Sequence, residues 1–279
     1  MDEHFRAFTF VDRITSVQPG VQIRGHYTIP PGLDNFPASL VAEAVGQLAA
    51  WSAMAALDFK VRPVAGLAGG VEFLSPVRPG QRLELTAELE SAEADAVAYG
   101  GSASADGVPV IRLEHCVGPM MPLEDFDDPQ TLRKRFALLC AQGATPGGFG
   151  GILMVALERS GGEPGRWTRA TLQVPTSANF FADHFPRRPV FPGTLLMDAN
   201  LRLAASLAAE LPVENGDGWK LRSVSNVKLR AFTPPGESLE LEARLDERTE
   251  KSARLVVEIR KGQRVVGGAR VLLAAEARP

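Results

Sequence analysis

The sequence predicts an α+β protein made of two similar halves, each an antiparallel sheet wrapped around one long central helix. Three observations carry this prediction. The chain repeats itself once along nearly its whole length, each copy holds one apolar stretch of helical length, and the segments after that stretch alternate between apolar and polar residues. The repeat settles the domain organisation, because 279 residues alone fit either one large domain or two small ones.

Each half opens with a predicted hairpin. Residues 10–30 match residues 155–175, and the proline–glycine pair at 19–20 stands against the same pair at 164–165. Glycine adopts the positive φ that a tight turn requires, and proline favours the position before it. We therefore expect two short antiparallel strands around each of these turns.

One long helix follows in each half, predicted over residues 37–57 and 192–210. Both segments begin at a proline, which is favoured in the first turn of a helix. The first segment is long enough to cross a bilayer, but it contains Glu43, Gln47 and two serines. We expect it to be a helix buried in the core of a soluble protein.

The segments after each helix are predicted to be strands of an antiparallel sheet. Around residues 83–90 and 239–245, leucine and alanine alternate with polar or charged residues, a period of two that buries one sheet face. Asp-Gly at 106–107 and Lys-Gly at 261–262 separate apolar runs, as hairpin turns do.

The composition changes between the halves, and the predicted boundaries lie there. We place the first half at residues 1–117, a linker at residues 118–150 and the second half at residues 151–279. Asp127 or Asp128 can cap a short linker helix that starts at the following proline. The basic residues in the middle of this helix are expected to form a solvated face: Arg133, Lys134 and Arg135.

Composition and charge exclude several classes of function. Hydrophobic residues make up 45% and charged residues 23%, as in ordinary globular proteins. Thirty basic residues against 33 acidic ones give a net charge of −3, which does not favour a nucleic-acid partner. The two cysteines, Cys116 and Cys140, provide no CxxC pair, so we expect neither a metal site nor a disulfide framework. The first residues lack the pattern of a signal peptide, so we expect a cytoplasmic protein without membrane insertion.

The two halves differ most in the segment before the long helix. Residues 30–37 of the first half correspond to residues 175–192 of the second, which is the longer segment. The extra residues bring His184 close to the start of the helix. Three prolines stiffen this loop: Pro186, Pro189 and Pro192. A histidine held rigidly against a helix N-terminus predicts a functional site.

The loop also resembles a known family. Residues 184–193 read HFPRRPVFPG, and an acid follows at Asp198. This pattern is similar to the signature of the (3R)-hydroxyacyl-ACP dehydratases of the FabA/FabZ type, which have the hotdog fold. Arg187 stands where that family usually has a small residue. The opening hairpins and the later proline–glycine pairs extend the resemblance to both halves, which implies two tandem hotdog domains forming a pseudo-dimer.

The resemblance further implies an active site that takes its histidine from one hotdog unit and its carboxylate from the other. Only the second half has the histidine, His184, and the first half has the acid, Glu43. Gln47 lies one helical turn after Glu43 and can orient it, as in the acid-x-x-x-Gln pattern of the family. In the second half Arg202 stands in that place, and we expect it to hold Asp198 ionised in a structural pair. A catalytic role of Asp198 stays open.

The implied reaction removes water from a 3-hydroxyacyl thioester and gives a trans-2-enoyl product, without a metal or a redox cofactor. His184 would be the base at C2 and Glu43 the acid for the leaving hydroxyl. The backbone N–H of Gly193 is the candidate donor to the thioester oxyanion. Arg187 and Arg188 are candidates for binding the phosphate of a phosphopantetheine arm or an acidic carrier protein.

Two alternatives remain open at this point. The chain could be a hotdog acyl-thioesterase, which would use a carboxylate and water, or a non-catalytic protein that binds acyl thioesters. In each case the expected partner is a thioester of acyl carrier protein or coenzyme A. Acyl chain length and further association of the double unit into a homo-oligomer are left open.

Overall fold

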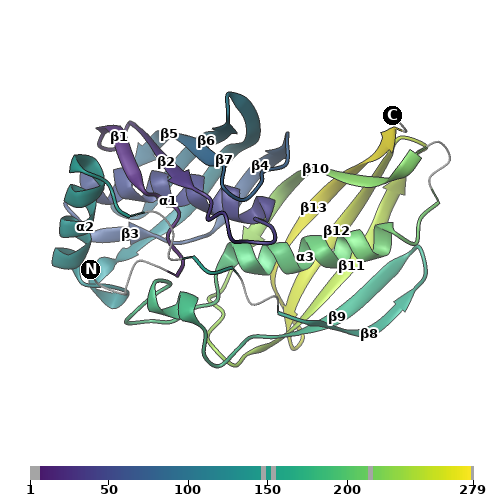
Figure 1. Ribbon diagram of the computed structural model, residues 1–279. Helices are drawn as coiled ribbons and strands as arrows, with labels where there is room; N and C mark the ends of the chain where they lie inside the picture. Colours follow the sequence, from purple (N-terminus) through teal and green to yellow (C-terminus); the bar gives the residue numbers. More distant parts are fainter. Residues whose placement is uncertain (1–6, 146–148, 152–154, 213–215, 278–279) are drawn as a thin grey trace.

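The strands form one antiparallel sheet that runs through both halves of the chain (Figure 1). The computed structural model describes residues 7–145, 149–151, 155–212 and 216–277. Sheet predominates over helix in this part of the chain, so the expected α+β class does not describe it well, although the expected antiparallel sheet and one long helix in each half are present.

The two halves arrange their strands in the same order. The first half contains β1 (Arg13–Gln18), β2 (Gln22–Thr28), β3 (Val61–Pro63), β4 (Leu67–Phe73), β5 (Arg82–Ala92), β6 (Ala96–Ala105) and β7 (Val108–Pro122). The second half contains β8 (Leu157–Glu163), β9 (Trp167–Gln173), β10 (Gly216–Leu229), β11 (Ser238–Arg248), β12 (Ser252–Lys261) and β13 (Arg264–Ala277). Across the sheet they run β1-β2-β5-β6-β7-β4 and then β10-β13-β12-β11-β9-β8, with β3 paired to β7. The second series is the first in reverse, so a pseudo-twofold axis passes between β4 and β10.

The predicted opening hairpins are confirmed. β1 pairs with β2 and β8 pairs with β9, and the turn glycines Gly20 and Gly165 have φ of 76° and 70°. The last hairpin differs by one residue from the expectation. Because β12 continues through Lys261, the turn falls on Gly262 and Gln263, and Gly262 takes the positive φ of 57°.

Two long helices lie against the concave side of the sheet, one in each half (Figure 1). α1 (Ala38–Ala56) begins directly after Pro37, and α3 (Gly193–Ala208) begins directly after Pro192, as predicted. α1 packs on β2, β5 and β6, α3 packs on the matching β9, β11 and β12, and the two helices contact each other. Among the helices of the described residues, none is long and apolar enough to cross a membrane.

The predicted period of two places one face of each half-sheet in the core. The alternating residues of β5 and β11 that face the helices are almost completely buried: Leu83, Leu85, Ala87, Leu239, Leu241 and Ala243. At about 25 cal/mol per Å² of apolar surface removed from water, rows of this kind supply much of the stabilisation of a sheet packed on a helix.

The predicted linker boundary cuts through a strand. β7 continues past residue 118 to Pro122 and is followed by the short helix η1 (Leu123–Asp125), so the first half extends further than expected. α2 (Pro129–Ala141) then forms as predicted, with the side chain of Asp128 accepting a hydrogen bond from the backbone N–H of Thr131 at 2.7 Å. α2 ends before Gly143, whose φ is 78°, while residues 146–148 of the glycine-rich run lie outside the described residues.

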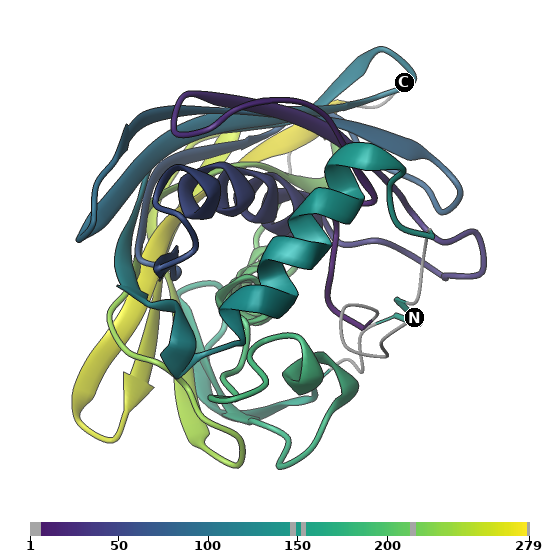
Figure 2. The ribbon, with the colours of Figure 1, turned by 90° about the vertical axis from the view of Figure 1, so that its left-hand side faces the viewer.

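α2 lies across the outer end of the first half, in front of α1 in the view of Figure 2. Its basic triplet was expected to be solvated, and only Lys134 is exposed. Arg133 donates to the backbone carbonyl of Asp58, and Arg135 lines a cavity beneath the helix. The expectation of a solvated face is therefore wrong for Arg135, whereas the side chain of Arg133 stays partly in solvent at 42% exposure.

Candidate active site

His184 lies in the proline-rich loop directly after the short helix η2 (Asn179–Ala182). Its Nδ1 is 3.0 Å from the backbone carbonyl oxygen of Val190. A carbonyl oxygen only accepts, so in the neutral ring Nδ1 carries the proton and Nε2 keeps a free lone pair. The ring also stacks on Phe185, with 4.1 Å between the ring centroids. The loop thus fixes both the orientation and the tautomer of the imidazole.

The surroundings of His184 favour the neutral ring. Burial lowers the pKa of His184 below the ordinary 6.5, and the positive charge of Arg62 lowers it as well. The negative charge of Glu43 and the hydrogen bond to Val190 raise the pKa, but they do not offset the burial. A neutral imidazole with a free Nε2 is the form that a general base requires.

Glu43 is held by a hydrogen bond on each of its carboxyl oxygens. The side-chain amide of Gln47 donates to Oε1 at 2.9 Å, and the hydroxyl of Thr194 donates to Oε2 at 2.7 Å. Gln47 is fixed in turn, because its Nε2 also donates to the carbonyl of Phe8 at 3.1 Å and its Oε1 accepts from the N–H of Phe10 at 2.9 Å. The structure therefore brings Gln47 against Glu43 as the four-residue spacing implied.

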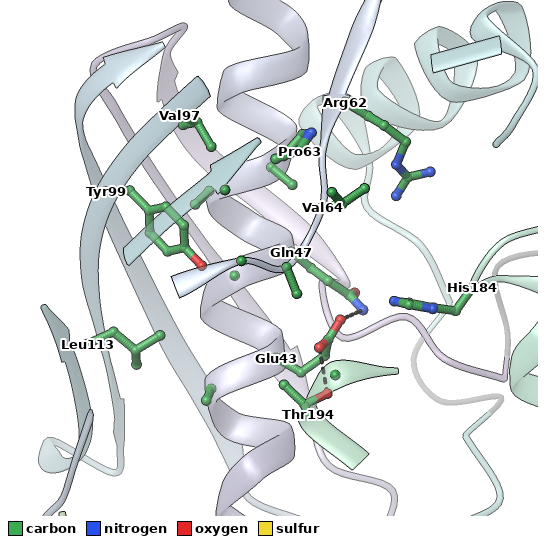
Figure 3. A pocket seen from close by; sticks show the side chains of 18 of the residues that line it. Glu43, Gln47, Arg62, Pro63, Val64, Val97, Tyr99, Leu113, His184 and Thr194 are labelled. Carbon is green, nitrogen blue, oxygen red and sulfur yellow. Dashed lines mark hydrogen bonds between the residues drawn. The ribbon is translucent and has the colours of Figure 1, made fainter. Parts of the chain in front are cut away.

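Glu43 and His184 come from different halves and face the same cavity, with Gln47 and Thr194 beside them (Figure 3). The cavity has a volume of about 270 Å³, and most of its wall is apolar. Two of the residues that line it, Leu67 of β4 and Val117 of β7, are also 48% and 36% exposed. An apolar cavity with a few convergent polar groups is the usual form of a small-molecule site.

Gly193 is the first residue of α3 and lines the cavity. A Cβ atom at this position would lie 2.5 Å from Cδ1 of Leu229 and 3.4 Å from Cβ of Ala65, so only glycine fits without a shift of its neighbours. The first N–H groups of a helix have no acceptor within the helix, and the dipole adds positive potential there. This end of α3 can thus stabilise negative charge in the cavity.

Asp198 lies apart from that cavity, against a small void of about 10 Å³ that Arg202 also lines. The predicted ion pair is present, with 3.1 Å between Arg202 Nε and Asp198 Oδ2. Burial nevertheless raises the pKa of Asp198, and the charge of Arg202 and a hydrogen bond from Ser39 act in the opposite direction. The charge of Arg202 thus opposes the effect of burial on this carboxyl, within the ion pair that the sequence predicted.

Arg187 and Arg188 are exposed and are not among the described residues that line the cavity. Arg187 donates to the carbonyl of Glu124 at 2.8 Å, and its Nη2 is 3.9 Å from Oδ1 of Asp128. The guanidinium of Arg188 lies over the ring of Phe232, 4.6 Å from its centroid. Both side chains therefore tie the histidine loop to neighbouring segments while remaining open to solvent.

Sequence reasoning missed several polar groups of the cavity, among them Arg62, Tyr99 and Thr194. The guanidinium of Arg62 lies 3.8 Å from the centroid of the Phe185 ring, and burial lowers its pKa to about 10 against the opposing charges of Asp127 and Glu43. Burial raises the pKa of Tyr99. Arg62 and Tyr99 belong to no sequence pattern, but Thr194 had a signal, since it matches Ser39 of the first half.

Sequence comparisons show that part of the chain is similar to known dehydratases. Residues 163–269 match the family model of the ApeI-like dehydratases, a range that includes His184 and Asp198 but not Glu43. A 3-hydroxyacyl-[acyl-carrier-protein] dehydratase FabZ of Roseiflexus sp. (strain RS-1) is 33% identical over 84 residues, which are 30% of this chain and 59% of that protein. The FabZ of Escherichia coli O9:H4 (strain HS) is 29% identical over 82 residues, 29% of this chain and 54% of its own. The chain thus spans a little over half the length of these relatives.

Solved structures match the chain over nearly all of its length. A 12:0-ACP thioesterase from Umbellularia californica superposes with a TM-score of 0.56 at 10% identity, covering 91% of this chain and 94% of its own. An acyl-ACP thioesterase from Bacteroides thetaiotaomicron VPI-5482 gives 0.51 at 13% identity, covering 90% and 97%. Such identities establish the fold alone. The chain has a hotdog-like fold, residues 163–269 are similar to the ApeI-like dehydratases, and part of the chain is similar to 3-hydroxyacyl-[acyl-carrier-protein] dehydratases.

Proposed function

We propose that this protein removes water from 3-hydroxyacyl thioesters to give trans-2-enoyl thioesters. The observation that carries the proposal is the meeting of Glu43 and His184 in one cavity, although they come from opposite halves of the chain (Figure 3). The sequence match of the second half to dehydratases supports the same reaction. Fatty-acid or polyketide-type biosynthesis is the corresponding context.

We also propose that the chain is a fused pair of hotdog units with a single active site. The mirrored strand order, one long helix per half and the β4–β10 pairing support the pair. Only the second half has the histidine loop, and only the first half combines an acid with a glutamine one turn later. The second carboxylate, Asp198, faces Arg202 and a void too small for a substrate.

The proposed reaction assigns one step to each group. Nε2 of His184 takes the proton from C2, and the electrons of that C–H bond form the C2–C3 double bond while the C3–O bond breaks. Glu43, in its protonated form, gives its proton to the departing hydroxyl, which leaves as water. The N–H of Gly193 stabilises the negative charge that develops on the thioester oxygen. A general acid and a general base of this kind contribute about 10²–10⁴-fold each.

The thioester would reach the cavity on a phosphopantetheine arm, carried by acyl carrier protein or by coenzyme A. Arg187 and Arg188 are the proposed docking residues, because both are exposed and both lie within four residues of His184 in the loop that bears it. Arginine suits either a phosphate or an acidic protein surface.

Hydrolysis of the thioester is the second candidate function. It is favoured by the likeness in fold to acyl-ACP thioesterases over more than nine tenths of the chain. A carboxylate such as Glu43 could then activate water. Hydrolysis, however, gives no role to the loop that orients His184 towards the cavity, and this is the reason to rank it second.

A direct assay separates the candidates. The purified chain is incubated with 3-hydroxyacyl and saturated acyl thioesters of coenzyme A, pantetheine and acyl carrier protein, and the products are weighed by mass spectrometry. Dehydration predicts loss of one water from the 3-hydroxyacyl thioesters with the thioester intact. Release of free acid from either set would replace the proposal by a thioesterase, and unchanged substrates that nevertheless bind would replace it by a binding protein.

A further inference from the structure

The hydroxyl of Thr194 contacts Glu43 across the boundary between the two halves. Thr194 is the second residue of α3, and Glu43 lies on α1. The distance of 2.7 Å between Thr194 Oγ1 and Glu43 Oε2 is that of a strong hydrogen bond to a carboxylate. Both residues line the cavity, so the bond lies where the proposed reaction takes place (Figure 3).

The pseudo-twofold axis repeats this contact at the other carboxylate. Ser39 is the second residue of α1, and its hydroxyl is 3.4 Å from Oδ1 of Asp198 on α3. Each helix therefore directs a hydroxyl from its first turn to the acid of the other helix. The contact follows from how the two helices pack against each other. The distance between hydroxyl and carboxyl oxygens is shorter at Glu43, which faces the cavity, than at Asp198.

The two partners of Glu43 differ in what they can do when the carboxyl changes its protonation state. The amide nitrogen of Gln47 only donates, and the hydrogen bonds of Gln47 with the backbone of Phe8 and Phe10 fix the orientation of the amide. Oε1 of Glu43 therefore always accepts a hydrogen bond from Gln47. A hydroxyl can donate or accept. Thr194 can therefore donate to the carboxylate and accept from the protonated acid until the O–H of the acid turns to the leaving hydroxyl, with the same two oxygen atoms in contact.

We infer that Thr194 is a positioning residue for Glu43, and that Oε2 is the oxygen that carries the proton delivered to the leaving hydroxyl. The inference rests on the proposed dehydration. A general acid loses and regains its proton in each turnover, and Thr194 keeps the carboxyl oriented in both states. The residue supplies no proton of its own to the product.

Two variants separate this role from packing. Thr194→Val keeps the shape of the side chain but removes the hydroxyl, and Thr194→Ser restores the hydroxyl with a smaller side chain. We expect kcat to fall about tenfold or more in Thr194→Val, the usual consequence of losing a hydrogen bond to a charged group, with KM nearly unchanged. Thr194→Ser should recover most of the loss. Thr168→Val, a buried threonine on β9 away from the cavity, is the matched control and should retain wild-type kinetics.

Crystal structures of the wild type and both variants give a second measurement that needs no activity. Glu43 Oε2 should face residue 194 in the wild type and in Thr194→Ser, and should turn away or take several conformers in Thr194→Val. An unmoved Glu43 in Thr194→Val, a kcat equal to wild type, or a Thr194→Ser as impaired as Thr194→Val would overturn the inference. A wild type that dehydrates no substrate, with Glu43 displaced in Thr194→Val, would instead retain the positioning and reject the proposed function.

Discussion

The ring of His184 and the carbonyl of Val190 are joined by a hydrogen bond of 3.0 Å between residues six positions apart in one loop. The bond leaves the lone pair of the imidazole on Nε2. The prolines of the loop restrict the backbone that presents Val190, so the motif acts on the chemistry of the histidine through a carbonyl rather than through any proline side chain. This explains how a pattern of prolines can indicate the proposed site.

The proposed site makes the two carboxylates unequal. We expect dehydration to fall by about 10²–10⁴-fold in His184→Ala and in Glu43→Gln, because each variant removes one proton-transfer group. Asp198→Asn should keep most of the activity, since Asp198 lies outside the cavity and pairs with Arg202. Steady-state kinetics on one 3-hydroxyacyl thioester, with thermal melting to confirm folding, provides the comparison. A comparable loss in Asp198→Asn would place the acid in the same half as the histidine.

The pH dependence of kcat/KM should reflect the protonation of His184. Its pKa lies below 6.5, and only the neutral ring accepts the C2 proton, so kcat/KM should persist below pH 6.5 before it falls. The charge of Arg62 contributes to this lowering. Arg62→Met should therefore move the acid limb of kcat/KM to higher pH, while Arg62→Lys, which keeps a positive charge, should leave it near its wild-type position. An acid limb that does not move in Arg62→Met would show that another group controls it.

How much of the structure can be predicted from the sequence depends on whether an interaction is local or joins distant segments. The helices, the hairpins and the buried faces follow local rules, and the start of α3 beside Pro192 was predicted from the apolar stretch that this proline opens. Glu43 and Gln47 could be paired because they are one turn apart. Thr194 could not be placed against Glu43, since that contact joins residues 151 positions apart and depends on how the helices cross. The stacking of Arg62 on Phe185 could not be predicted either, because these residues also lie far apart in the sequence.

The linker shows a second limit. Arg135 was expected in solvent, because a run of basic residues on a helix usually is. The structure places Arg135 in the wall of the cavity, and its electrostatic partners, Asp12 and Asp183, come from distant segments. Burial of this helix face is a tertiary property that the periodicity of thirteen residues does not reveal.

Asp12 should make the stability of the protein depend on pH. It is 6% exposed and accepts a hydrogen bond from the N–H of Thr28 at 2.6 Å. Burial raises its pKa from 3.8 to about 6, although the bonds from Thr28 and the charge of Arg135 oppose the rise. Because the folded-state pKa is the higher one, the contribution of Asp12 is fully present below pH 3.8 and is lost as the pH rises through 6.

The measurement compares unfolding by denaturant in the wild type and in Asp12→Asn, which cannot ionise but still offers an oxygen to Thr28. The free energy of unfolding of the wild type, relative to the variant, should fall by on the order of 3 kcal/mol between about pH 4 and about pH 7. Parallel curves for the two proteins over this range would contradict the raised pKa of Asp12.

The last prediction concerns the carrier. If Arg187 and Arg188 dock it, reversing both charges to glutamate should raise KM strongly for carrier-protein substrates and less for pantetheine analogues that lack the phosphate. kcat should stay nearly unchanged, because these residues would touch only the non-reacting end of the substrate, and the binding they supply is common to ground state and transition state. The wild-type advantage should also shrink as salt rises, since long-range attraction between exposed charges is screened.

The contacts of Arg187 with Glu124 and Asp128 require a control. A glutamate at position 187 would face Asp128 and could disturb the loop by repulsion, whereas glutamine removes the charge without reversing it. We therefore expect the double glutamine variant to show the same effect on KM in weaker form, with an unchanged melting temperature. An unchanged KM for carrier-protein substrates in both double variants would assign the two arginines to loop structure alone. The exposed Lys134 of α2 would then be the next residue to test.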